Sequence, residues 1–203
     1  MLKPVHRDNP KKQVMDEIAA QLNKGKIYIL PTDTVYAFVT VPDNKKSIEK
    51  LYQLKSLPVG KKPLSLYCRD FSQASQYIRM TGNQAYRWGK AHLPGPYTLV
   101  FQASKKLSQY SITKQKTVGI RIIEHPVIQD LLARLEQPLI GTSVFTDEDF
   151  LTYPEELDEK YGKQIEAVVD CGPIEPAFST VLDMRTFPPE VLREGKGEIS
   201  DIY

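Results

Sequence analysis

The repeated change of hydrophobic period along the chain is the feature that most limits its fold. Short β-branched and aromatic runs, typical of strands, alternate with segments whose apolar residues recur at helical spacing. The alternation is irregular and covers the whole length, and no linker, repeat or low-complexity tract interrupts it. We therefore expect a single α/β domain over residues 1–203, with an open, twisted, mixed sheet between helical layers (an α/β/α architecture).

The same pattern places the expected elements. Helices are predicted from Asn9-Pro10 to Gly25, from Asn44 to Lys55, from Asp70 through Met80 and, after an interruption at Gly82, in a second stretch to about His92. Two further helices are predicted after His125-Pro126 and over 154–161. Strands are predicted over 26–30, 35–41, 64–68, 97–103, 118–122, 138–142, 167–171, 180–184 and 191–193.

Composition excludes several classes of protein. Of the 203 residues 41% are hydrophobic and 26% are charged, which is too hydrophobic for a disordered chain. A net charge of +2 gives no overall attraction to nucleic acid or anionic lipid. Cys68 and Cys171 lack a CxxC partner, so we expect free thiols in a reducing compartment. With no signal peptide and no membrane-spanning run, the protein is expected to be cytoplasmic.

The segment Pro31-Thr32-Asp33-Thr34 is the strongest local signal for a site. It is rich in hydroxyls, carries a carboxylate, and connects two predicted strands. Strand ends are where α/β folds commonly hold their ligands, while Asp33 could pin the turn by accepting backbone N–H groups. A plain turn without a ligand explains the same spacing equally well.

Cationic side chains form a second group of candidates. Lys55, Lys61, Lys62 and Arg69 cluster around a helix end and the next strand, as a phosphate site would require, although a solvated charged face is the commoner explanation. Arg121 lies in an apolar strand, where it needs either an anionic ligand or a structural ion pair. The histidines show no metal-ligand spacing, so no metal site is expected, and GxGxxG, GxxxxGK[ST] and GxSxG motifs are absent.

Eight sequence blocks, taken in order, resemble the YrdC/YciO family. They are PTDTVYA (31–37), the helix ending in Lys55, KKPLSL (61–66), PGPYT (94–98), TVGIR (117–121), GTSVF (141–145), STVLD (179–183) and REG (193–195). The resemblance covers nearly the whole chain and implies the YrdC-like fold with a concave, positively lined face. It also implies threonylcarbamoyl-AMP synthase chemistry, in which L-threonine, bicarbonate and ATP give threonylcarbamoyl adenylate and pyrophosphate for tRNA modification.

The resemblance assigns roles to individual residues. Thr34, Arg121, Ser143 and Ser179 match positions that hold threonine, and Lys55, Lys62, Thr117 and Arg193 match positions that bind the nucleotide. Lys55 and Ser143 also match two members of a Lys-x-Arg and Ser-x-Asn catalytic tetrad. Mg²⁺ is expected to accompany ATP, because the sequence offers no carboxylate cage.

Two departures from the tetrad point to the YciO branch. Leu57 replaces its arginine and Phe145 its asparagine, and each lost charge-assisted hydrogen bond is worth about 1.5–3 kcal/mol. We therefore expect weak or absent synthase activity. The alternative is a protein whose basic face binds double-stranded RNA or tRNA without sequence reading.

Overall fold

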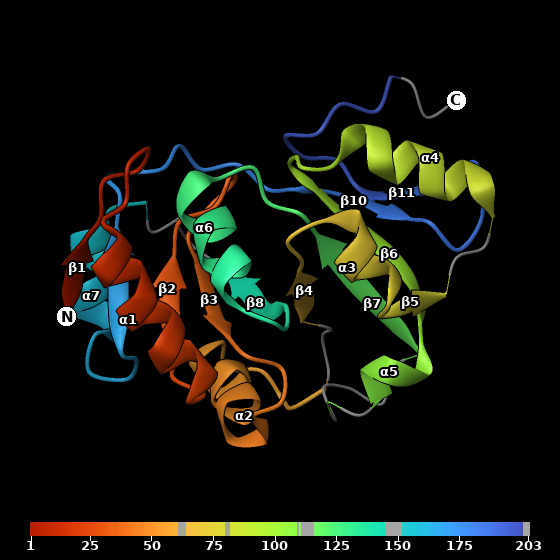
Figure 1. Cartoon of the computed structure of the whole chain (residues 1–203). Helices are drawn as coiled ribbons and strands as arrows, with labels where there is room; N and C mark the ends of the chain where they lie inside the picture. The colour runs from red at the N-terminus through yellow and green to blue at the C-terminus, as the bar shows by residue number, and fades with distance from the viewer. Residues whose placement is uncertain (61–63, 80–81, 109, 111–115, 145–151, 201–203) are drawn as a thin grey trace.

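One mixed sheet runs through the molecule (Figure 1). The computed structural model describes residues 1–60, 64–79, 82–108, 110, 116–144 and 152–200. Within these residues eleven strands join in the order β1-β9-β2-β3-β8-β4-β7-β6-β10-β11, and β5 pairs with β6 off this path. Parallel pairs (β4 with β7, β6 with β10) lie beside antiparallel ones (β3 with β8, β6 with β7). The expected α/β fold with a mixed, twisted sheet is confirmed.

Most elements lie where the sequence predicts them. The strands are β1 Leu2–Pro4, β2 Tyr28–Leu30, β3 Ala37–Thr40, β4 Ser65–Tyr67, β5 Ile78–Arg79, β6 Tyr97–Ala103, β7 Thr117–Arg121, β8 Leu139–Ser143, β9 Ala167–Asp170, β10 Thr180–Asp183 and β11 Glu190–Arg193. The helices are α1 Lys12–Asn23, α2 Lys45–Leu54, α3 Phe71–Ser75, α4 Asn83–His92, α5 Lys105–Ser108, α6 Pro126–Arg134 and α7 Pro154–Tyr161.

Helices cover both faces of the sheet around β2 and β3. Alternate strand residues face opposite ways, so Tyr28 and Leu30 pack with α1 and α6, whereas Ile29 packs with α2 and α7. Figure 1 shows α1 and α6 together on the face toward the viewer. The result is the expected three-layer arrangement, with a buried apolar core on each face.

Several strand bounds differ from the prediction by one or two residues, β1 and α5 were not predicted, and two helices differ more clearly. The helix expected through Met80 ends at Ser75, and Ile78–Arg79 instead forms β5 against Ala103 and Gln102 of β6. The first helix begins at Lys12 rather than at Asn9-Pro10. In the first case a strand partner more than twenty residues away decides the structure, which helical periodicity within the segment cannot reveal.

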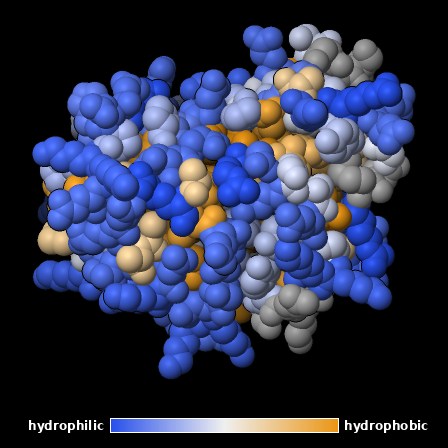
Figure 2. Space-filling view, viewed as in Figure 1, coloured by the Kyte–Doolittle hydropathy of each residue, from blue (hydrophilic) through white to orange (hydrophobic). Residues whose placement is uncertain are grey.

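The face of the molecule shown in Figure 2 is mainly polar. In the view of Figure 2 hydrophilic residues cover most of the face, and hydrophobic residues show in small areas between them. Among the described residues no helix is both long and apolar enough to span a bilayer.

The two cysteines are free thiols, with Cys68 buried and Cys171 half-buried. Burial raises the pKa of each thiol, to about 12 for Cys171, so neither is a ready nucleophile.

Candidate functional site

A cavity of about 840 Å³ lies at one end of β8 beside β4, β6 and β7. Its described lining includes four cationic side chains and no Asp or Glu. The cations are Lys55, Arg121, Lys160 and Arg193. A hollow that gathers positive charge without carboxylates attracts anionic ligands.

Strand alternation builds one wall of this cavity. Ser65 on β4, Thr98 on β6 and Thr117 on β7 face the cavity, while the residues between them, such as Leu66 and Leu99, pack in the core. Gly119 also faces the cavity, and a Cβ there would lie 2.9 Å from the Ser65 hydroxyl oxygen. The missing side chain keeps this wall open for a ligand.

The C-terminal end of α2 builds another part of the cavity wall. Ser56 adopts the left-handed conformation (φ 52°), and it donates its N–H to the Gln53 carbonyl at 2.9 Å. Leu57 donates its N–H to the Tyr52 carbonyl at 2.9 Å, which completes a Schellman motif. The motif turns the chain so that both Lys55 and Leu57 line the cavity.

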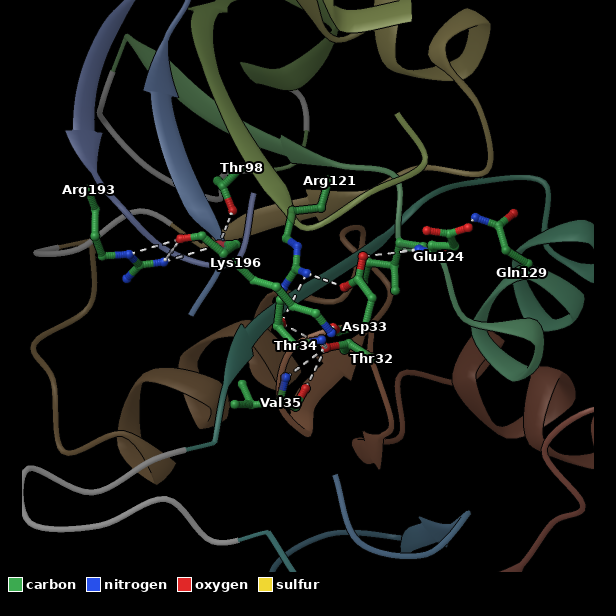
Figure 3. Close-up of polar contacts among 12 residues, drawn as sticks. Thr32, Asp33, Thr34, Val35, Thr98, Arg121, Glu124, Gln129, Arg193 and Lys196 are labelled. Carbon is green, nitrogen blue, oxygen red and sulfur yellow. Dashed lines mark hydrogen bonds and ion pairs between the residues drawn. The ribbon is translucent and has the colours of Figure 1, made fainter. Parts of the chain in front are cut away.

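Thr32 pins the turn that carries the predicted substrate residues. Its hydroxyl oxygen accepts the N–H groups of Thr34 and Val35, both at 3.1 Å, and donates to the Val35 carbonyl at 2.5 Å. The sequence prediction gave this role to Asp33. The hydroxyl of Thr32 performs it instead, which leaves the carboxylate of Asp33 available for other partners (Figure 3).

Arg121 is a buried cation with a buried counter-ion. Its side chain is 3% exposed, and Nη2 donates to Asp33 Oδ1 at 2.5 Å and to Thr34 Oγ1 at 3.1 Å. Asp33 Oδ2 accepts the Glu124 N–H at 3.2 Å. Arg121 Nε has no partner among the described residues. Arg121 therefore both forms a structural ion pair and lines the cavity (Figure 3).

Arg193 is fixed by two groups of a single residue. Its Nε and Nη2 donate to the Ser179 carbonyl at 3.1 and 2.9 Å, and Nη2 also reaches Ser179 Oγ at 3.1 Å. Ser179 Oγ in turn lies 2.8 Å from Thr98 Oγ1. Burial, and then the positive charge of Arg121, lower the pKa of Arg193, although a guanidinium stays charged at neutral pH. Arg121 and Arg193 thus both line the same cavity, where each contributes a positive charge.

The structure brings most of the predicted site residues together. The residues that line the cavity are Lys55, Thr117, Arg121, Ser143, Ser179 and Arg193. Thr34 contacts the cavity residue Arg121 without belonging to the lining itself. Lys62 and Phe145 fall outside the described residues. Arg69, expected in the cationic cluster, instead pairs with Asp70 at 3.3 Å and is not part of the lining.

Sequence reasoning missed one wall of the site. Lys160 and Gln164, at and just after the end of α7, also line the cavity. Their segment was interpreted as a short charged helix, because nothing local distinguishes a cavity-lining lysine from a solvated one. No group of three or more His, Cys, Asp or Glu suited to a metal ion occurs in the part of the chain that the structure describes.

Comparison with known proteins gives a consistent result. A family model for Sua5/YciO/YrdC proteins, described as "Telomere recombination", matches residues 20–195. YciO of Escherichia coli, described as uncharacterized, is 31% identical over 202 residues, 96% of this chain and 95% of its own. Its crystal structure has a TM-score of 0.92 at 29% identity and covers 100% of this chain and 99% of that one.

Two further relatives carry a functional description. Threonylcarbamoyl-AMP synthase of Vibrio vulnificus is 31% identical over 186 residues, 89% of this chain and 98% of the relative. Sua5 of P. abyssi, in a crystal structure described as complexed with L-threonine, has a TM-score of 0.87 at 24% identity. That match covers 96% of this chain and 57% of Sua5, and it is a likeness of fold.

Proposed function

The chain belongs to the Sua5/YciO/YrdC family, and on this premise we propose that its cationic cavity binds ATP and L-threonine for threonylcarbamoyl adenylate synthesis at a low rate. The observation that carries the proposal is a cavity of about 840 Å³ whose described lining holds four cations and no carboxylate. Such a volume suits a small polyanion rather than a macromolecule. The Vibrio vulnificus synthase supplies the substrate class.

The amino acid is proposed to bind at the Arg121 end. A guanidinium is the side chain best suited to a carboxylate, and the hydroxyls of Ser143 and Ser179 line the same cavity. Thr34 helps to fix Arg121 through its 3.1 Å contact. These groups would hold threonine by its carboxylate and leave its amine free to react.

The triphosphate is proposed to bind along Lys55, Lys160 and Arg193, with Thr117 as a further hydrogen-bonding group. Fixed cations there would stabilise the charge that develops on the α-phosphate and on the leaving pyrophosphate. Mg²⁺ would enter as the ATP complex, because the described lining offers hydroxyls but no carboxylate to hold the ion by itself.

The reaction follows from holding these substrates side by side. The threonine amine bonds to the carbon of bicarbonate, and water leaves to give a carbamate. A carbamate oxygen then bonds to the α-phosphorus of ATP. At the same time the bond between the α-phosphorus and the oxygen of the leaving pyrophosphate breaks. The protein's contribution is orientation and charge stabilisation, with Lys55 and Ser143 proposed nearest the reacting groups.

Leu57 gives the physical reason for a low rate. It lines the cavity where it adds no hydrogen bond to a phosphate, and its place in the Schellman motif packs it partly against the core. An arginine there could donate two charge-assisted bonds worth about 1.5–3 kcal/mol each. Losing one such bond costs roughly tenfold or more in rate, and losing both costs roughly a hundred- to ten-thousandfold.

RNA binding is the weaker candidate. Duplex RNA is recognised by cations spread along an outer surface. Here Arg121 is 3% exposed and Arg193 is anchored to Ser179, both at the cavity. The burial of Arg121 at the cavity favours a small anion.

Calorimetry with ATP, AMP and L-threonine, separately and together, tests the proposal, combined with incorporation of labelled bicarbonate into adenylate. We expect binding of both substrates and slow turnover, which Leu57→Arg combined with Phe145→Asn should raise. Leu57→Ala is the matched control, since it alters the same motif without adding a donor. Absence of ATP and threonine binding would refute the proposal, and salt-sensitive retention of duplex RNA would favour the alternative.

A further inference from the structure

The Arg121–Asp33 ion pair joins the linings of two cavities. Arg121 lines the cationic cavity, whereas Asp33 lines a second cavity of about 710 Å³. The two side chains are 3% and 8% exposed and meet at 2.5 Å (Figure 3). A pair buried this deeply, at the border of a proposed ligand site, calls for an explanation beyond fold stability.

Asp33 is held by three residues from two separate segments of the chain. Oδ1 accepts from Arg121 on β7, and Oδ2 accepts the Glu124 N–H just after β7. Its backbone carbonyl accepts from Lys196 Nζ at 2.9 Å. Because each carboxylate oxygen has its own donor, the carboxylate is fixed and can in turn fix the guanidinium.

The hydrogen bonds of Arg121 are divided between its ends. Nη2 is occupied by Asp33 and Thr34, whereas Nε has no partner among the described residues. A guanidinium carries five N–H donors. Nε is itself buried, so an anion in the cationic cavity, which Arg121 lines, would bind the remaining donors while Nη2 stays on Asp33.

We propose that Asp33 is a positioning residue for Arg121: it holds Nη2, presents the rest of the guanidinium to a ligand carboxylate, and weakens its net attraction for that carboxylate. The identity of the ligand, L-threonine, rests on the proposed function. With Asp33 in place, the carboxylate meets a neutral pair, so its binding depends on hydrogen-bond geometry more than on charge. The site thereby selects a correctly placed carboxylate over other small anions.

Paired substitutions separate positioning from charge. Asp33→Asn keeps an acceptor for Nη2 and removes the charge, and it should tighten L-threonine binding about tenfold while leaving threoninamide unaffected. Asp33→Ala removes both the hydrogen-bond acceptor and the negative charge, and it should weaken L-threonine binding relative to Asp33→Asn. Asp183→Asn is the matched control, because Asp183 is also buried and paired with an arginine, Arg185, outside the cavity.

A ligand-free measurement covers variants that fail to fold. In wild-type protein with ¹⁵N-labelled arginine, NMR should resolve separate Nη signals for Arg121, because its rotation is restricted; averaged signals would overturn the proposal. Equal threonine affinity in wild type, Asp33→Asn and Asp33→Ala would overturn it as well. If wild-type protein binds no threonine, the proposed function fails, and the NMR result still decides whether Asp33 positions Arg121.

Discussion

Arg193→Lys tests whether the geometry of the cavity matters beyond its charge. The guanidinium makes three contacts to Ser179, at 3.1, 2.9 and 3.1 Å, and an ammonium can replace about one of them. A lysine ammonium also lacks the planar, forked donors that a guanidinium offers to a phosphate. We expect ATP affinity to fall about tenfold, which corresponds to roughly 1.4 kcal/mol, after allowance for the partial solvent exposure of Arg193.

Titration calorimetry at several salt concentrations measures this effect. The salt dependence should match that of wild type, because the positive charge is retained. Arg185→Lys is the control: Arg185 forks onto the Asp183 carboxylate outside the cavity lining, so its loss should leave ATP binding unchanged. The reasoning is refuted if Arg193→Lys binds ATP within twofold of wild type, or if Arg185→Lys loses as much affinity.

Three further predictions concern stability and the missed wall of the site. Burial, and then the charge of Arg7, lower the pKa of His125 to about 4. The neutral imidazole therefore favours the folded state fully above pH 6.5, and the free energy of unfolding should fall by about 3 kcal/mol as the pH drops toward 4. Urea unfolding at several pH values should show a smaller decline in His125→Gln, and an equal decline would contradict the prediction. Ser56→Gly should stabilise the fold by about 0.5–1 kcal/mol in the same assay, since φ is 52°, and an unchanged or lowered midpoint would contradict this. Lys160→Ala should weaken ATP binding about fivefold. Lys163 lies outside the lining, so Lys163→Ala should leave ATP binding unchanged, and equal effects of the two substitutions would contradict the role of Lys160.

Local sequence signals predicted the elements that depend on local interactions. Asn44 caps α2 by accepting the Ser47 N–H at 3.0 Å, as its position before the helical pattern indicated, and 97–103 and 154–161 match β6 and α7 at both ends. The failures depend on distant partners. β1 exists because Leu2 and its neighbours pair with β9, more than 160 residues away, and three residues carry no readable period.

The candidate site divides in the same way. Resemblance supplied the residues Arg121, Ser179 and Arg193, and the fold places all three at one cavity. Sequence alone could not assign the partner of Arg121, because a buried arginine requires an anion without specifying whether it is a side chain or a ligand. Asp33, 88 residues earlier in the chain, is that partner.

The most direct test of the central claim is a crystal structure of the protein with ATP and L-threonine both added. We expect the triphosphate to lie against Lys55, Lys160 and Arg193, and the threonine carboxylate to lie on Arg121 with Asp33 still in contact. An empty cavity at saturating ligand, or ligands bound elsewhere on the protein, would contradict it.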